Sequence, residues 1–114
     1  MSSKVKIKNL RHTIFKVEVP WHIKVDRSSP LGNPFPMDMA TGESRDIVCD
    51  KYGVWFVKQL TTDRDDPTYN KLFNTELGRL ERIYEKYRKL ELFCWCAPKR
   101  CHAQTIKRYL EGVL

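Results

Sequence analysis

The stretch LELFCWCAPKRCH, residues 90–102, carries the pattern that decides the fold of this 114-residue chain. Its first seven residues form an almost continuous apolar run, which is typical of a strand buried on both faces of a sheet. A proline and two basic residues follow, and a Cys-His pair then opens an amphipathic segment with Ile106, Tyr109, Leu110 and Val113 on one side. This order predicts a central strand, a tight connection and a terminal helix.

Three short segments near the start of the chain are predicted to be extended. Lysine and apolar residues alternate over residues 4–8, as in a half-exposed strand. Residues 14–19 alternate again before Pro20, which favours a strand or an extended edge, and residues 21–25 (WHIKV) favour another strand. Because the last strand is the most apolar, we expect it to lie at the centre of the sheet.

Two helices are predicted between these strands. Ser44 is a helix-capping residue type, and the first helix should run from it to about Gln59. Its apolar stripe consists of Ile47, Val48, Tyr52, Trp55 and Phe56. Gly53 inside this helix costs about 1 kcal/mol relative to alanine, so we interpret it as a close packing contact. The second helix has an apolar face made of Phe73, Leu77, Leu80, Tyr84 and Tyr87.

These elements predict an α/β domain of the small open-sheet type. We expect a mixed or mostly parallel sheet of about three to five strands, flanked by three helices. The length suits one domain over residues 1–114. No apolar run approaches the roughly 20 residues that span a bilayer, and the first residues lack a signal-peptide core. We therefore expect a cytoplasmic protein without membrane contact, where disulfides among Cys49, Cys94, Cys96 and Cys101 are disfavoured.

Two loops are predicted to meet at one edge of the sheet. One is the segment 28–42, rich in proline and glycine, and the other is APKRCH at residues 97–102. In open α/β sheets, ligands bind beyond the carboxyl ends of the strands. The predicted ligand-binding residues are Asn9, Arg11, Arg27, Gly32, Asn33, Lys99, Arg100, Cys101 and His102. The alternative is that the segment 28–42 is only an elaborate connection into the first helix.

The charge of the chain indicates the class of partner. A formal net charge of +7 favours anionic partners such as nucleic acid, nucleotides or phosphorylated metabolites. Lys4, Lys6 and Lys8 share one face of the predicted first strand, so a nucleic-acid-binding module using this basic face is an alternative function. No helix-turn-helix, RNA-recognition or zinc-finger signature accompanies these residues, and a solvated basic face is the simpler interpretation.

Cys101 and His102 are the candidate catalytic residues. A thiol near a helix start and beside Lys99 and Arg100 is shifted toward thiolate, and a neighbouring histidine can act as its base. Adjacent helical residues point about 100° apart, so His102 does not automatically face Cys101, and His12 or His22 are alternatives. Inert packing of the thiol is the simpler interpretation.

A zinc site is a weaker interpretation of the same region. Cys94, Cys96, Cys101 and His102 have the ligand types of a zinc site, but their spacing does not match the usual pairs from tight turns. We therefore expect no metal and no cofactor, and a zinc-stabilised interaction protein is kept as an alternative. We expect Trp95 to pack in the core.

Two segments together resemble a known family. SPLGNPF at residues 29–35 and LFCWCAPKRCHAQTIKRYL at residues 92–110 resemble the domain-of-unknown-function family 4326 of bacteria and bacteriophages. Its members show an arginine before a Leu-Gly-Asn-Pro-Phe loop, then Cys-Trp-Cys, a proline and Cys-His on a terminal helix. The matching residues are Arg27, Leu31, Gly32, Asn33, Pro34, Phe35, Cys94, Trp95, Cys96, Pro98, Cys101 and His102, with a weaker match at Asn9 and Arg11.

The resemblance implies that the matching residues form one family site, and it implies no particular reaction. A phage origin would suit a role in nucleotide metabolism or in countering host defence. Together with the charge and the two loops, it leads us to expect a protein that binds a phosphorylated, nucleotide-like small molecule. Whether the protein also cleaves that ligand, and in what oligomeric state it acts, stay open at this point.

Overall fold

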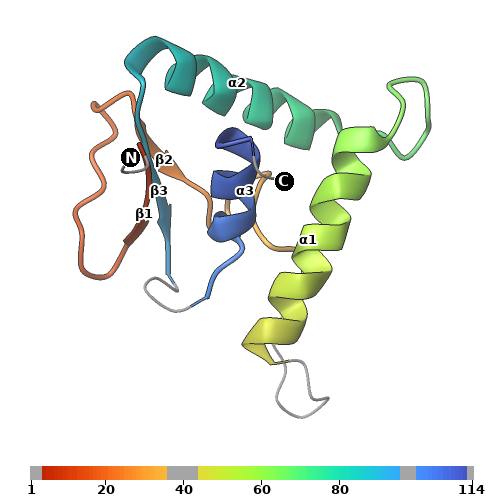
Figure 1. Cartoon of the computed structure of the whole chain (residues 1–114), viewed down its shortest axis with the longest axis horizontal. Helices are drawn as coiled ribbons and strands as arrows, with labels where there is room; N and C mark the ends of the chain where they lie inside the picture. The colour runs from red at the N-terminus through yellow and green to blue at the C-terminus, as the bar shows by residue number, and fades with distance from the viewer. Residues whose placement is uncertain (1–3, 36–43, 96–99, 113–114) are drawn as a thin grey trace.

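A computed structural model describes residues 4–35, 44–95 and 100–112 (Figure 1). The elements in chain order are β1 (Val5–Asn9), β2 (His22–Lys24), α1 (Arg45–Thr61), α2 (Lys71–Tyr87), β3 (Leu90–Cys94) and α3 (Ala103–Leu110). The described strands form one parallel sheet, so the predicted α/β fold is confirmed.

The last strand lies at the centre of the sheet, as predicted. The strand order is β1-β3-β2, with Val5 opposite Leu90 and Ile23 opposite Leu92. Leu92 and Phe93 on β3 are both fully buried because neighbouring chain covers both faces of the strand. Since the described strands are parallel, the carboxyl ends of β2 and β3 meet at one edge of the sheet.

The prediction of a strand or extended edge over residues 14–19 is wrong. The chain from 10 to 21 is irregular, and Ile14 and Val17 are 76% and 85% exposed. Because β1 and β2 flank β3, this connection crosses from one edge of the sheet to the other. The Phe15 side chain packs this connection onto the sheet, because its ring contacts the Phe93 ring edge-on at a centroid distance of 5.3 Å.

The two faces of the sheet differ in what covers them. Leu90, Leu92 and Cys94 join the core formed with the helices, whereas Glu91 points the other way and pairs with His22 at 3.1 Å. Figure 1 shows α3 between the sheet and α1, with α2 running along one end of the molecule. The helix α1 packs against α2 and α3. This packing places its amino-terminal half beside the edge of the sheet where β2 and β3 end.

Side-chain caps fix the starts of the two long helices. The Ser44 hydroxyl accepts from the Ile47 amide at 3.4 Å, and the Asn70 side chain accepts from the Phe73 amide at 3.0 Å. The predicted α1 stripe is wrong at Ile47, which is 43% exposed. The interpretation of Gly53 as a packing contact is also wrong, because nothing lies within 4 Å of a Cβ built there.

No helix formed by the described residues combines the length and apolarity that a membrane crossing requires.

Candidate functional site

A pocket of about 300 Å³ lies beyond the carboxyl ends of β2 and β3. Five of the predicted ligand-binding residues line it, namely Arg27, Asn33, Arg100, Cys101 and His102. The segment after β2, the start of α1 and the approach to α3 all contribute to its walls. The predicted meeting of the two loops is therefore present in the described part of the chain.

Three other predicted residues do not line this pocket. Asn9 ends β1, where its Oδ1 accepts from the Arg11 amide at 2.7 Å and its Nδ2 donates to the Trp95 carbonyl at 3.3 Å. Arg11 is exposed in the crossing segment. Gly32 lies in the segment after β2 but outside the pocket lining. Lys99 falls outside the described residues.

The segment after β2 is held by its own polar groups. Asn33 is 6% exposed; its Nδ2 donates to the Val48 carbonyl at 3.2 Å, and its Oδ1 accepts from the Phe35 amide at 2.8 Å. The Arg27 guanidinium donates to the Asn33 carbonyl and, at 2.9 Å, to the Phe35 carbonyl. These two residues therefore build one wall of the pocket and join it to α1.

Gly32 is required by a close approach of two backbone segments. A Cβ built there would lie 2.2 Å from the Asp26 carbonyl oxygen and 2.7 Å from the Arg27 Cα. Side chains other than hydrogen are therefore excluded at this position. The structure therefore gives Gly32 a role in folding the segment after β2.

Two arginines at the pocket differ in how their charge is compensated. Arg100 donates to Asp46 Oδ1 at 3.0 Å and to Asp50 Oδ1 at 2.6 Å, and these bonds raise its pKa further. Arg45, at the first position of α1, makes no ion pair within the described residues. Arg45 was not predicted, although the Ser44 cap places it in the first turn of α1, close to Val48 and Cys49.

The Trp95 side chain forms an exposed apolar surface at the pocket. Its prediction as a core residue is wrong, because it is 58% exposed. Trp95 lies just beyond the end of β3, where it lines the pocket together with Val48 and Cys49 of α1. Its indole Nε1 donates to Asp26 Oδ2 at 3.2 Å. Burial acts to raise the pKa of Asp26, but hydrogen bonds from Ser28 and Trp95 outweigh it and hold the pKa below its usual value.

Cys101 and His102 face each other at the base of the pocket. Cys101 Sγ lies 3.5 Å from His102 Nδ1, and His102 Nε2 contacts the Val25 carbonyl. The pairing that helical geometry did not guarantee is present because α3 begins only at Ala103, so neither residue is inside the helix. Burial lowers the pKa of His102, which keeps its imidazole neutral at pH 7.

The other two histidines lie elsewhere. His22 pairs with Glu91 on the opposite face of the sheet and accepts from the Lys16 amide at 3.1 Å. His12 is exposed in the crossing segment. Among the three histidines, His102 is therefore the one that the structure brings to Cys101.

The zinc alternative has little support in the described residues. Within residues 4–35, 44–95 and 100–112, no three histidine, cysteine or acidic side chains gather in a way that could hold a metal ion. Cys94 is buried on the helix-facing side of β3, while Cys101 and His102 line the pocket. Cys96, the fourth member of the suggested set, lies outside the described residues.

Comparison with known proteins identifies one family. A family model described as "Domain of unknown function (DUF4326)" matches residues 8–112 of the chain. No curated protein matches the chain, and no solved structure matches it. The match spans both strand-end loops and the whole pocket lining.

Proposed function

Because the chain belongs to the domain of unknown function family DUF4326, we propose its function from the pocket itself: it binds a phosphorylated, nucleotide-like small molecule. The family match confirms the resemblance seen in the sequence motifs, and its description states no ligand. The observation that carries the proposal is that one pocket combines arginine side chains with an exposed indole. Arginine suits phosphate, and an indole face suits a nucleobase.

The positive charge available to a ligand comes from Arg27 and Arg45. Arg27 donates to two backbone carbonyls, which are neutral, so its charge is not cancelled by these bonds. Arg45 makes no ion pair within the described residues, whereas two carboxylates already neutralise Arg100. A guanidinium binds phosphate oxygens through paired, charge-assisted hydrogen bonds. We therefore assign the phosphate mainly to Arg45, with Arg27 contributing at longer range.

Trp95 supplies the surface for the base. Asp26 holds its indole nitrogen, which fixes the ring while leaving its surface accessible. Stacking of a base on an aromatic ring contributes about 1–3 kcal/mol. Since the Asp26 carboxylate repels a phosphate, we expect the base near Trp95 and Asp26 and the phosphate toward α1.

The size and position of the pocket favour a small molecule over a polymer. Its volume of about 300 Å³ lies at the lower end of the roughly 300–1,000 Å³ typical of small-molecule sites. Cys101 and His102 immediately precede α3, and the amides at a helix start attract anions. On the alternative basic face, Lys8 is already paired with Glu91 at 3.9 Å. We place this binding in the cytoplasm, which is the host cytoplasm if the protein is encoded by a phage. There it would serve nucleotide metabolism or sequester a nucleotide signal.

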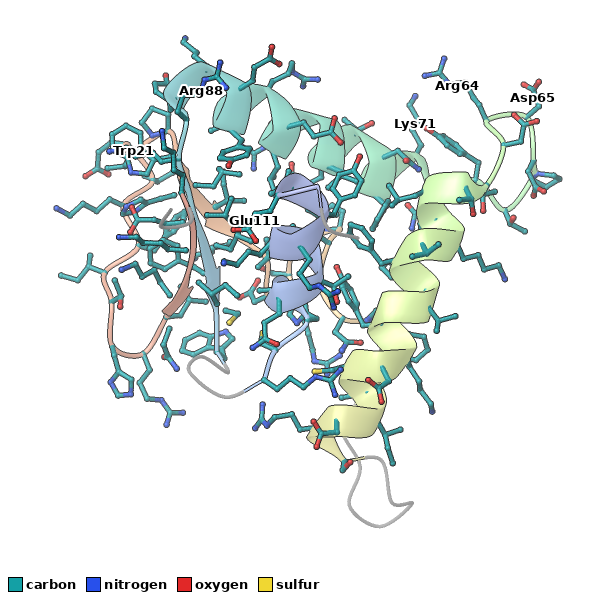
Figure 2. All side chains as sticks on the ribbon, viewed as in Figure 1. Trp21, Arg64, Asp65, Lys71, Arg88 and Glu111 are labelled. Carbon is teal, nitrogen blue, oxygen red and sulfur yellow. The ribbon has the colours of Figure 1, made fainter. Side chains whose placement is uncertain are left out.

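Isothermal titration calorimetry with AMP, GMP, CMP, UMP and inorganic phosphate tests this proposal. We expect one-to-one binding of at least one nucleotide, tighter than phosphate, and about ten-fold weaker binding after Arg45→Ala. Arg64→Ala is the matched control, because Arg64 points outward on the loop between α1 and α2, on the side away from the sheet (Figure 2). Absence of binding by all four nucleotides would overturn the proposal.

A single-stranded oligonucleotide distinguishes the alternative function. If it binds while the mononucleotides do not, and Lys6→Ala weakens that binding, the basic face is the functional surface. Steep salt dependence would accompany that result.

A further inference from the structure

The base of the pocket holds a thiol and an imidazole in the arrangement of a nucleophile and its base. We propose that Cys101 is a nucleophilic thiol and His102 its general base, so that the pocket adds the thiol across a C=O or C=N bond of its ligand. The identity of the ligand rests on the proposed function, but the reactivity of the thiol does not. The proposal is carried by the geometry of three groups: Cys101 Sγ, the His102 ring and the Val25 carbonyl.

The hydrogen bonds of His102 decide which ring nitrogen carries the proton. Nε2 faces the Val25 carbonyl, and a carbonyl oxygen only accepts, so Nε2 must donate. In the neutral ring this leaves a lone pair on Nδ1, which lies 3.5 Å from Cys101 Sγ. The thiol proton therefore has an acceptor in place. A nucleophile, a base and a third group that orients the base are the parts of an activated thiol site.

The surroundings keep the ring in this orientation. Val25 is itself tied to the sheet, because its amide donates to the Phe93 carbonyl at 2.9 Å. The Tyr52 ring packs edge-on against the imidazole at 5.0 Å, and its hydroxyl donates to the Leu31 carbonyl at 2.7 Å. His102 is only 7% exposed. The base is therefore held by β2, α1 and the segment after β2 together.

The surroundings of the pair act on both protonation states of His102. Burial and the nearby Arg27 charge lower its pKa and keep the ring neutral, so that its Nδ1 lone pair is available before the reaction. Once protonated, the ring would be stabilised by its bond to the Val25 carbonyl and by the Asp26 carboxylate. The thiolate would lie just before the first turn of α3, where the helix dipole favours negative charge.

The proposed step balances without any further reactant. The Cys101 thiol proton moves to His102 Nδ1 as the sulfur attacks the electrophilic carbon. A C–S bond forms and the π bond to oxygen or nitrogen breaks, leaving its electron pair on that atom. His102 then returns the proton to the same atom, so the net change is addition of S–H across the double bond. A carbonyl or ring C=N carbon of a nucleobase is the class of group that fits.

Alkylation by iodoacetamide, followed by tryptic mass spectrometry, measures the reactivity of each site without a ligand. Trypsin separates Cys101 on residues 101–107, Cys49 on residues 46–51, and Cys94 with Cys96 on residues 90–99. Cys49 is the internal control, because it lines the same pocket and is similarly buried. We expect Cys101 to react about ten-fold faster than Cys49 near pH 7, with a rate that persists below the usual thiol pKa of about 8.5.

His102→Gln tests the base, because the glutamine amide can still donate to the Val25 carbonyl but offers no basic nitrogen. We expect labelling of Cys101 to slow by about ten-fold or more, whereas His12→Gln on the exposed crossing segment leaves it unchanged. Equal rates for Cys101 and Cys49, or a wild-type rate in folded His102→Gln, would overturn the proposal. If that variant does not fold, the pH profile of the wild-type protein decides instead. An alkylation rate of Cys101 that falls with pH as the thiolate fraction of an ordinary thiol does would overturn the proposal.

Adding AMP separates this inference from the proposed function. Protection of Cys101 by AMP supports both. Labelling that depends on His102 but is unaffected by any of the four nucleotides supports the reactive thiol and overturns the nucleotide assignment.

Discussion

The segments that follow β1 and β2 leave the sheet in the same direction, yet only the segment after β2 lines the pocket to which we assign the ligand. Residues 10–21 cross the sheet with Ile14 and Val17 exposed, while the Phe15 ring packs on Phe93 of β3. Residues 25–35 bury Leu31 completely and Asn33 almost completely. The difference shows that the end of a parallel strand is not sufficient for a site. The loop must also be fixed by buried contacts of its own.

The physical cause is what lies beside each segment. The segment after β2 reaches α1 within hydrogen-bonding distance, so Asn33 can donate to Val48 and Tyr52 can donate to Leu31. The segment after β1 instead crosses the face of the sheet opposite the helices, and most of its residues are exposed there. This comparison leads to four predictions, each pairing a change in residues 25–35, or in the pocket they enclose, with a matched change elsewhere.

The largest effect is expected at Gly32. Gly32→Ala should lower the free energy of unfolding by about 4 kcal/mol, because its Cβ would overlap the backbone of Asp26 and Arg27. The matched change Gly53→Ala lies in open space inside α1 and should raise stability by about 1 kcal/mol. Urea denaturation measures both. If Gly32→Ala changed the free energy of unfolding no more than Gly53→Ala does, the segment after β2 would not be rigid.

A somewhat smaller loss is expected from the buried side chain of the same segment. Leu31→Ala should cost about 3 kcal/mol, since it removes a fully buried side chain from the core. Val17→Ala in the crossing segment should change stability by less than about 0.5 kcal/mol, because Val17 is exposed. Comparable losses in thermal unfolding would remove the distinction between the two segments.

The two asparagines provide the polar version of this comparison. Asn33→Ala should cost about 2 kcal/mol, because two buried hydrogen bonds to α1 and Phe35 disappear. Asn9→Ala removes bonds that are open to solvent and should cost about 0.5 kcal/mol. Denaturant midpoints decide the order. A larger cost at Asn9 would reverse the proposed roles of the two strand ends.

The smallest effect is a pH dependence from His102. Burial lowers its pKa in the folded state, so the unfolded chain binds the proton more readily below its ordinary value of 6.5. Stability should therefore fall by about 1 kcal/mol between roughly pH 7 and 5.5. His102→Gln should lose this part of the pH dependence, while His12→Gln should keep it. A slope unchanged in His102→Gln would contradict the burial of a neutral ring.

Much of the fold could be predicted because its signals are local. The apolar run of residues 90–96 indicated the central strand, and Ser44 and the spacing of apolar residues indicated α1 and α2. The prediction for residues 14–19 was wrong because an exposed connection can also show alternation when a few of its side chains, such as Phe15, pack on the sheet. Whether such a segment forms a strand of the sheet depends on the order of the strands, which the alternation of apolar and polar residues does not determine.

The site was predictable in its location but less so in its details. The LGNPF and APKRCH segments indicated the edge of the sheet that carries the pocket. Arg45 was missed because its role depends on how α1 lies beside the sheet. Trp95 was included in the family site by the resemblance, but its exposure at the pocket depends on where β3 ends and could not be predicted. The contact between Cys101 and His102 depends on the backbone just before α3, where helical spacing no longer applies.

The tryptophan indole signals in a ¹H–¹⁵N correlation spectrum, followed during titration with the nucleotide monophosphates, test the central proposal most directly. The three indoles report different places: Trp95 at the pocket, Trp21 bonded to Glu91 at 3.1 Å and packed on Tyr87 of α2, and Trp55 packed on Phe73. We expect the Trp95 signal to shift and the other two to stay in place. A shift of Trp21 alone, or no shift at all, would contradict a nucleotide site between β2, β3 and α1.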